Sequence, residues 1–182
     1  MGDGCTAGGH SFPEALIDNA QLVKGESTAT GLTPTTGWIE IFSFSWGASN
    51  PTTVGTTAAG LSAGKVSISS FNIMKKTENS SPTLFQACAQ GQHFKSAKVV
   101  MRKAAGSSGK QQSFLEYDFT DLMVESIQWS GSSGGDDTPT ESVSFAFAAV
   151  TVNYWPQDTA TGGQGTLNTA SWDLTKAAVV AA

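Results

Sequence analysis

The side chains that most often carry out chemistry in proteins are sparse in this chain. It contains two histidines, His10 and His93, and two cysteines, Cys5 and Cys88. These four residues are spread along the chain and match no metal-ligand spacing, so we expect no metal site. His93 with Ser96 and a carboxylate is an arrangement that a hydrolase would use, but His93 directly follows a predicted helix end and is expected to hydrogen-bond locally instead.

The remaining candidate groups favour structural roles. Asp136 and Asp137 are adjacent in a loop rich in glycine and serine, where such pairs are more often solvated turn residues than calcium ligands. The glycines follow no phosphate-binding pattern at the start of a helix. Cys88 lies on the apolar face of a predicted helix, which favours a small buried hydrophobe over a reactive thiol. We therefore predict no enzyme activity and no cofactor.

Composition and charge narrow the class of partners. Charged residues make up 14% of the chain, and the formal net charge is −5 without any basic block. A polyanionic partner such as a nucleic acid is therefore not expected. The low charge content has two interpretations, a surface that another subunit covers or a solvated surface rich in serine and threonine, and both stay open at this point.

One short helix is strongly marked over residues 82–90. Ser81 precedes it and is expected to cap the first amides, and Pro82 occupies the first helical position, where its missing N–H costs nothing. Gly91 supplies the left-handed conformation that ends a helix. Three apolar residues share one face of this helix, through which we expect it to pack on the rest of the protein. They are Leu84, Phe85 and Cys88.

Most of the remaining chain has the two-residue period of β-strands, with a bulge or bend between Ile68 and Phe71. The sequence predicts a mainly β fold, a barrel or a sandwich, with one short helix. The predicted strands are Ala15–Lys24, Trp38–Trp46, Val66–Lys76, Phe94–Lys103, Leu115–Trp129, Val143–Tyr154 and Ser171–Leu174.

Three segments carry more detailed predictions. The aromatic residues of the strand Trp38–Trp46 are expected on one face, and the alternation from Leu115 to Trp129 is expected to run without interruption. The strand Val143–Tyr154 is expected to change phase after Phe147. The segment Asn50–Gly64 has almost no bulky residue, which predicts a long loop that is either functional or disordered.

The chain divides into a flexible leader over residues 1–14, a single β domain over residues 15–176 and an apolar tail over residues 177–182. The leader has neither the basic start nor the apolar run of a secretory signal peptide, and the apolar stretches elsewhere are too short to span a membrane. We therefore expect a protein that is made in the cytoplasm and leaves the cell, if it does, without a cleaved leader.

Several blocks of the sequence resemble the haemolysin-coregulated protein (Hcp) family, the tube proteins of type VI secretion. The blocks occur in the family order with family-like spacing and cover nearly everything from about residue 15 to residue 175. They are Val23–Ser27, Gly37–Gly47, Phe71–Lys76, Ser80–Phe85, Gly91–Ala97 and Trp172–Leu174.

The resemblance implies a barrel-like subunit of two packed sheets and one helix that forms hexameric rings, which stack into a tube. In that family the tube lies inside a contractile sheath, is capped by a spike, carries effector proteins in its lumen and is expelled from the cell. The family has no catalytic residues to transfer. Its loop between the second and third strands contributes to contacts between subunits and rings, and it corresponds by position to the loop predicted here. The candidate interface residues are Asn50, Pro51, Thr52, Thr53, Val54, Gly55, Leu61 and Gly64.

Two classes of function stay open. The first is a tube subunit of a type VI or related contractile system, with copies of itself, sheath, spike and effectors as partners. The second is a free secreted effector or binding module that does not polymerise. Free sheet edges invite strand pairing, and identical subunits joined head to tail close into a ring when the rotation permits, which favours the first class.

Overall fold

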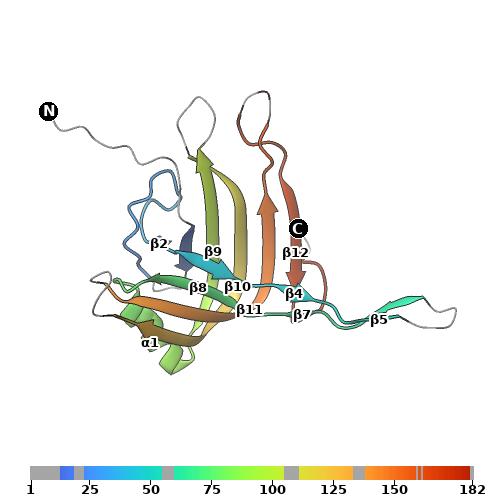
Figure 1. The fold of residues 1–182 in the computed structure, drawn as a ribbon, viewed down its shortest axis with the longest axis horizontal. Helices are drawn as coiled ribbons and strands as arrows, with labels where there is room; N and C mark the ends of the chain where they lie inside the picture. The colour runs from blue at the N-terminus through green and yellow to red at the C-terminus, as the bar shows by residue number, and fades with distance from the viewer. Residues whose placement is uncertain are drawn as a thin grey trace.

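Figure 1 shows the computed structural model, a strongly curled β-sheet with one helix and a projecting arm. The structure describes residues 13–18, 23–54, 60–104, 111–132, 138–158, 160 and 162–180. The strands are β1 (Glu14–Asp18), β2 (Ile39–Glu40), β3 (Ser43–Ser45), β4 (Ala48–Ser49), β5 (Thr52–Val54), β6 (Leu61–Ala63), β7 (Ser67–Ile68), β8 (Phe71–Lys76), β9 (His93–Ala104), β10 (Gln111–Ser130), β11 (Thr140–Tyr154) and β12 (Asn168–Asp173), and the helix is α1 (Ser81–Gln90).

The long strands β9, β10 and β11 form the centre of an eight-stranded sheet with the order β2-β1-β9-β10-β11-β8-β3. One edge of β11 has two partners, since Thr140–Phe145 pairs with β8 and Ala149–Tyr154 pairs with β12. The two ends of the sheet meet where β2 leads into β3, because Ile41 N donates to Pro13 O and Phe42 N donates to Met74 O. This junction curls the helix side of the sheet into a barrel and confirms the predicted mainly β fold with one helix.

The sheet bends along a line that crosses β10 at Asp121, where φ is 51°. Phe119 and Leu122 are both buried although they are three positions apart, and the buried Phe147 and Val150 on β11 are also three positions apart. Phe119 is opposite Val150 in the register, and Leu122 is opposite Phe147. Residues three apart on a regular strand point to opposite faces, so both strands reverse their faces at the same line. The part of the sheet on the β12 side of this line is called the upper sheet below.

This bend confirms the predicted phase change after Phe147, but the uninterrupted alternation predicted from Leu115 to Trp129 is wrong. Asp121 interrupts it first. A register shift between Val124 and Ser126 then interrupts it again, as a β-bulge does. Trp129 consequently lies 47% exposed rather than in the core.

Two other strand predictions are also wrong in part. The first strand ends at Asp18, and Val23 forms an antiparallel bridge back to Ile17, so the predicted strand Ala15–Lys24 is not continuous.

The predicted strand Trp38–Trp46 is divided between β2 and β3, and its aromatic residues do not share one face. Trp38 is buried in a small cluster with Leu32 and Val100, separate from the main core. Phe44 and Trp46 pack against the main core. Phe42 is 38% exposed. The reason is that this segment passes from β1, at one end of the sheet, to β8 at the other.

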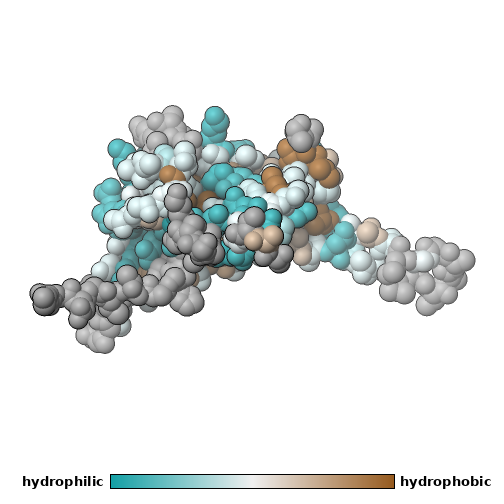
Figure 2. Space-filling model, turned by 90° about the horizontal axis from the view of Figure 1, so that it is seen from above, coloured by the Kyte–Doolittle hydropathy of each residue, from teal (hydrophilic) through white to brown (hydrophobic). Residues whose placement is uncertain are grey.

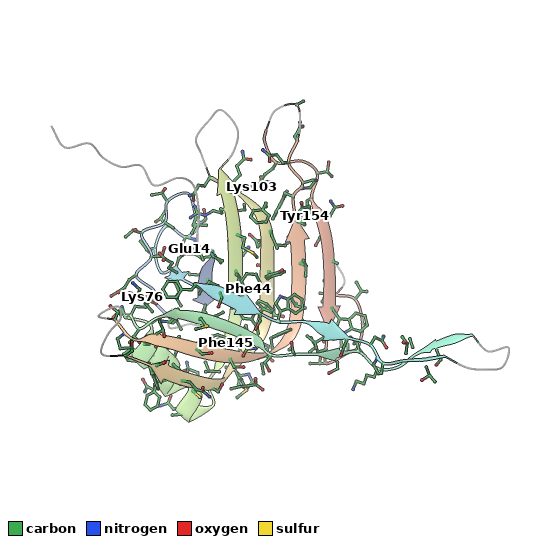
Figure 3. The ribbon with its side chains drawn as sticks, viewed as in Figure 1. Glu14, Phe44, Lys76, Lys103, Phe145 and Tyr154 are labelled. Atoms are coloured by element: carbon green, nitrogen blue, oxygen red, sulfur yellow. The ribbon has the colours of Figure 1, made fainter. Side chains whose placement is uncertain are left out.

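The main core lies within the curled part of the sheet and is rich in aromatic rings. Phe71 and Phe119 have ring centroids 4.6 Å apart, and Phe119 and Phe147 have centroids 4.8 Å apart. Figure 3 shows Phe44 and Phe145 within this curled part, whereas Lys103 and Tyr154 lie on the upper sheet. Aromatic pairs at these separations stabilise a core beyond the apolar area that they bury.

The helix begins at Ser81, one residue before its predicted start, and ends at Gln90 as predicted, with Gly91 at φ 64° after it. Its buried face is defined by Leu84 and Ala87 rather than by Phe85, which is 53% exposed. Phe85 packs edge-on against Trp129, with ring centroids 5.7 Å apart. Cys88 is partly buried against the core, as predicted for a small hydrophobe.

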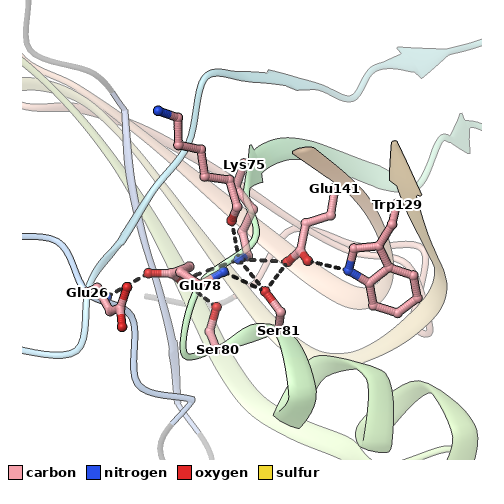
Figure 4. A network of polar contacts seen from close by, with 8 residues as sticks. Glu26, Lys75, Glu78, Ser80, Ser81, Trp129 and Glu141 are labelled. Atoms are coloured by element: carbon pink, nitrogen blue, oxygen red, sulfur yellow. Dashed lines mark hydrogen bonds and ion pairs between the residues drawn. The ribbon is translucent and has the colours of Figure 1, made fainter. Parts of the chain in front are cut away.

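Ser81 does not cap the helix as predicted, because the N-cap position belongs to Ser80 and no side chain caps there. The Ser81 hydroxyl instead donates to Glu141 Oε1 at 2.9 Å and accepts from Lys75 Nζ at 3.2 Å (Figure 4). Lys75 Nζ lies 2.7 Å from Glu141 Oε1, and both side chains are fully buried. Trp129 Nε1 donates to Glu141 Oε2 at 2.8 Å. This buried network joins the start of α1 to β8, β10 and β11.

Candidate self-association surfaces

The histidine proposed above as a candidate for catalysis is a surface residue. His93 Nδ1 lies 2.8 Å from Asp121 Oδ1, across the β9–β10 pair, and the two side chains are 63% and 61% exposed. This partner is 28 residues away along the chain, and the predicted local hydrogen bond of His93 stays a prediction. Ser96 is opposite Thr120 in the register, on the other side of the bend. This open arrangement provides no shielded pocket in which a nucleophile would be activated.

Several other candidate residues lie outside the described residues, namely Cys5, His10, Asp136 and Asp137. Within the described ranges, no three or more His, Cys, Asp or Glu side chains are grouped so that they could hold a metal ion. Over the same ranges, no helix has the length and apolar character needed to cross a bilayer.

The segment predicted as a long loop is instead largely a β-ribbon, which we call the arm. The arm comprises β4 to β7, with Ala48 opposite Ile68 at its base and Thr53 opposite Ser62 farther out. Figure 1 shows its outer part, near β5, projecting from the rest of the protein, whereas Ile68 at its base packs against the main core. The candidate interface residue Gly55 lies outside the described residues.

Backbone contacts hold the arm at two levels. At its base, Gly47 N donates to Ser69 Oγ at 2.9 Å, and Ser69 N donates to Gly47 O at 2.9 Å. Midway along, Gly64 N donates to Pro51 O at 2.8 Å, and a Cβ at Gly64 would lie 2.8 Å from the same oxygen. Glycine is therefore required where the two chains of the ribbon come this close.

Outside Lys65, which lies between β6 and β7, the arm carries no charged residue. Asn50, Pro51, Thr52 and Thr53 are all exposed, and no charged residue occurs from Ala48 to Gly64. A two-stranded ribbon without charges has free edges that invite pairing with another chain. This combination makes the arm a candidate contact surface for a second protein chain.

A row of polar side chains crosses the upper sheet from β9 to β12. Lys98 Nζ contacts Glu116 Oε1 at 2.7 Å and Asp118 Oδ1 at 3.0 Å. Asn153 Nδ2 donates to Asp118 Oδ2 at 3.0 Å, and Thr169 Oγ1 donates to Asn153 Oδ1 at 2.8 Å. Burial lowers the pKa of Lys98, but the hydrogen bonds to the two carboxylates outweigh it, so the pKa is raised overall. The row stiffens four strands on a hydrophilic face.

Both sides of the upper sheet have strand edges that no described strand covers. β1 pairs with β9 only as far as Val100, so Met101–Ala104 has no strand partner there among the described residues. On the opposite side, β12 pairs with β11, and its outer edge has no partner strand in the described part of the chain. Apart from the bridge between Asp173 and Ala178, one subunit therefore has two different edges without a partner strand among the described residues, which is the arrangement needed for head-to-tail association.

An apolar hollow of about 260 Å³ separates the base of the arm from the upper sheet. Trp46, Ile68 and Val150 line it together with Trp172. Trp172 Nε1 is buried and has no hydrogen-bond partner in the described part of the chain. An apolar cavity of this kind, next to a free edge, suits the side chains of another subunit.

A polar cavity of about 290 Å³ contains Glu14, Glu40 and Arg102. Glu14 is 4% exposed, and its Oε2 atom has no hydrogen-bond partner among the described residues. Burial raises the pKa of this carboxyl, and the charge of Glu40 adds to the effect, whereas the Ser27 hydroxyl and Arg102 oppose it. The folded state therefore favours the protonated form of Glu14.

Glu14 is expected to make the stability of the protein depend on pH. A folded-state pKa above the unfolded value gives stability that is complete below the unfolded pKa and is lost as pH rises through the folded pKa. Glu14→Gln should thus raise the free energy of unfolding by about 1 kcal/mol at pH 7 and leave it nearly unchanged near pH 3.5. Urea unfolding at both pH values measures this difference. Glu40→Gln, at an exposed position of the same cavity, serves as the control and should change the free energy of unfolding by less than half as much. An equal effect of Glu14→Gln at both pH values would contradict the raised pKa of Glu14.

Comparisons with known proteins give one consistent result. The family described as "type VI secretion system effector, Hcp" matches residues 15–154. Protein hcp1 of Pseudomonas aeruginosa is 38% identical over 93 residues, which are 51% of this chain and 56% of that relative. The alignment thus spans little more than half the length of this curated relative.

Two solved structures are similar over most of the chain. One, a type six secretion system protein, has a TM-score of 0.81 and 33% identity, and the match covers 93% of this chain and 100% of that one. Hcp1 from Salmonella typhimurium has a TM-score of 0.70 and 27% identity, with coverage of 93% and 100%.

Proposed function

Since the chain belongs to the Hcp family of secreted type VI secretion system proteins, we propose that it is a tube subunit that acts by binding copies of itself. The rings proposed are hexameric and stack into the inner tube of the secretion machine, with effector proteins carried in the lumen. The sheath and the spike are the further partners proposed. The subunit stays in the cytoplasm before firing and is then expelled without a cleaved signal peptide.

The single observation that carries this proposal is the pair of edges on the upper sheet that have no partner strand among the described residues. The outer edge of β12 and the edge of β9 beyond Val100 lie on opposite sides of the same sheet. Pairing the first edge of one copy with the second edge of the next uses both and repeats around a ring. A closed ring leaves no free edge to aggregate.

The arm is proposed to join one subunit to a neighbour in the same ring or in the next. Its contact residues are Asn50, Pro51, Thr52, Thr53, Val54, Gly55, Leu61 and Gly64. An exposed ribbon without charges gains stability by pairing or packing outside its own chain, because its own sheet offers it nothing beyond its base. We propose a different role for the polar row from Lys98 to Thr169. It forms a hydrated wall along which varied cargo passes.

Electron microscopy of the concentrated, negatively stained protein tests the proposal. Rings with a central channel, and short stacks of such rings, are expected. Particles the size of single subunits at all concentrations would contradict it and favour a free secreted module.

A further inference from the structure

The chain after β12 turns back and lies along the outer edge of that strand. We call residues 174–180 the tail segment. Asp173 N donates to Ala178 O at 2.8 Å, and Ala178 N donates to Asp173 O at 3.2 Å. Ser171 Oγ donates to Val180 O at 3.2 Å. The tail segment therefore begins an additional antiparallel pairing on the edge of the upper sheet.

The Asp173 carboxylate stabilises the turn that brings the tail segment back to the edge of β12. Its Oδ1 atom accepts from Thr175 N at 2.8 Å, from Thr175 Oγ1 at 2.6 Å and from Lys176 N at 3.0 Å. Lys176 Nζ lies 3.1 Å from the other carboxylate oxygen. The Thr175 hydroxyl and the contacts to Lys176 hold the pKa of Asp173 well below its usual range, so the carboxylate stays charged at neutral pH.

The register identifies which backbone groups of β12 face outward. Leu174 N donates to Ala148 O, and hydrogen-bonded pairs alternate along an antiparallel ladder. Alternate residues, Asp173, Ser171 and Thr169, therefore direct their N–H groups away from β11. The tail segment satisfies the amide of Asp173, but Thr169 N and Ser171 N have no hydrogen-bond partner among the described residues.

The tail segment is only weakly attached to the edge of β12. Ala177 has φ 50°, a left-handed conformation that is unfavourable for a residue with a side chain. Val179 is 70% exposed and Val180 is 38% exposed, so the apolar side chains after the turn gain little from burial. Figure 2 shows hydrophobic surface gathered on the side of the molecule where β12 lies. A segment held by a few hydrogen bonds and a strained turn is easily displaced.

We propose that the tail segment is a displaceable guard of the β12 edge. In the free subunit it occupies the position that a strand of a second copy takes in the assembly. Because the guard is part of the same chain, it competes at a high effective concentration and disfavours pairing when the protein is dilute. This inference rests on the proposed self-assembly, and it predicts that the subunit stays single until it is concentrated.

Deleting residues 177–182 tests the guard. Removing it should lower the concentration at which half of the protein is assembled by at least threefold, as measured by sedimentation velocity. The deletion also removes exposed valines, and the loss of apolar surface by itself would weaken association. Stronger assembly of the shortened chain therefore cannot be attributed to added hydrophobic surface. An unchanged or higher midpoint would overturn the guard.

Ala177→Gly is the matched variant in the opposite direction. Glycine adopts a φ of 50° without strain, so it stabilises the turned-back tail segment and should raise the assembly midpoint about threefold.

Hydrogen exchange gives a second measurement. On assembly of the unaltered chain, the amide of Ala178 should lose protection while those of Thr169 and Ser171 gain it.

The outcomes separate the guard from the proposed function. Assembly of the unaltered chain with no response to either variant would overturn the guard alone. A chain that stays single both with and without residues 177–182 would overturn the proposed function together with the guard.

Discussion

Replacing Lys75 by methionine is expected to lower the free energy of unfolding by about 3–5 kcal/mol. Lys75 and Glu141 are fully buried and 2.7 Å apart, so the substitution leaves the Glu141 carboxylate buried without its cation. Trp129 Nε1 and Ser81 Oγ would still donate to Glu141, but neutral donors do not replace a positive charge. Because α1 is attached to β8 and β11 through this network, near-ultraviolet circular dichroism should also change. Urea unfolding measures the loss.

Two variants control this result. Lys98→Met removes a second lysine that forms ion pairs on the sheet, but Lys98 is 38% exposed, and its loss should cost less than about 1 kcal/mol. The double variant Lys75→Met with Glu141→Gln should be more stable than the sum of the single effects predicts, since no unpaired charge then remains buried. A loss below about 1 kcal/mol for Lys75→Met, equal to that for Lys98→Met, would contradict the buried pairing.

Removing the outer part of the arm is expected to abolish assembly and to leave the fold intact. Residues 50–64 can be replaced by two glycines between Ser49 and Lys65, which keeps the β4–β7 pairing at the base. The outer part of the arm projects from the rest of the protein, so the free energy of unfolding should change by no more than about 0.5 kcal/mol. Light scattering and electron microscopy should then detect neither rings nor stacks.

A single charge on the arm provides a finer test of the same surface. Thr53→Glu places a carboxylate on the uncharged ribbon and should weaken assembly at least tenfold, because a charge buried in an interface loses its hydration. Thr36→Glu adds the same charge at an exposed position outside the arm and serves as the control. Tubes of the arm-deleted chain that match those of the unaltered chain would contradict a role for the arm in assembly.

The helix could be predicted from sequence because its signals are local. Pro82 and Gly91 mark its start and its end, and both act through their own backbone geometry. Ser81 was misinterpreted because a serine before a proline looks like a cap. Its actual partners, Lys75 and Glu141, come together only when β8 and β11 pair, which no local pattern reveals.

The sheet was predicted in outline, but its bends were not all visible. A phase change between Phe147 and Val150 left a signal in the hydrophobic pattern, and the strand β11 bends there. In β10 the apolar residues on both sides of Asp121 hid the same bend, since Leu122 and Met123 fit either phase. Periodicity cannot decide which face is buried when both neighbours are apolar.

The arm and the polar row were missed for a related reason. Small residues with little hydrophobic signal gave the arm the composition of a loop, although its strands are held by backbone pairing rather than by a core. Lys98, Asp118, Asn153 and Thr169 come from four strands, so their row depends on the register of the whole sheet. Sequence patterns could predict that these positions are polar but not that they are connected.

The molar mass of the purified chain in solution, measured by light scattering over a wide range of concentrations, tests most directly whether this protein acts through contacts with its own copies. Self-association predicts a mass that rises from the 18.8 kDa of one subunit to a defined multiple of it, about six-fold for the proposed ring, and then to larger stacks. A mass that stays at 18.8 kDa at every concentration would contradict it.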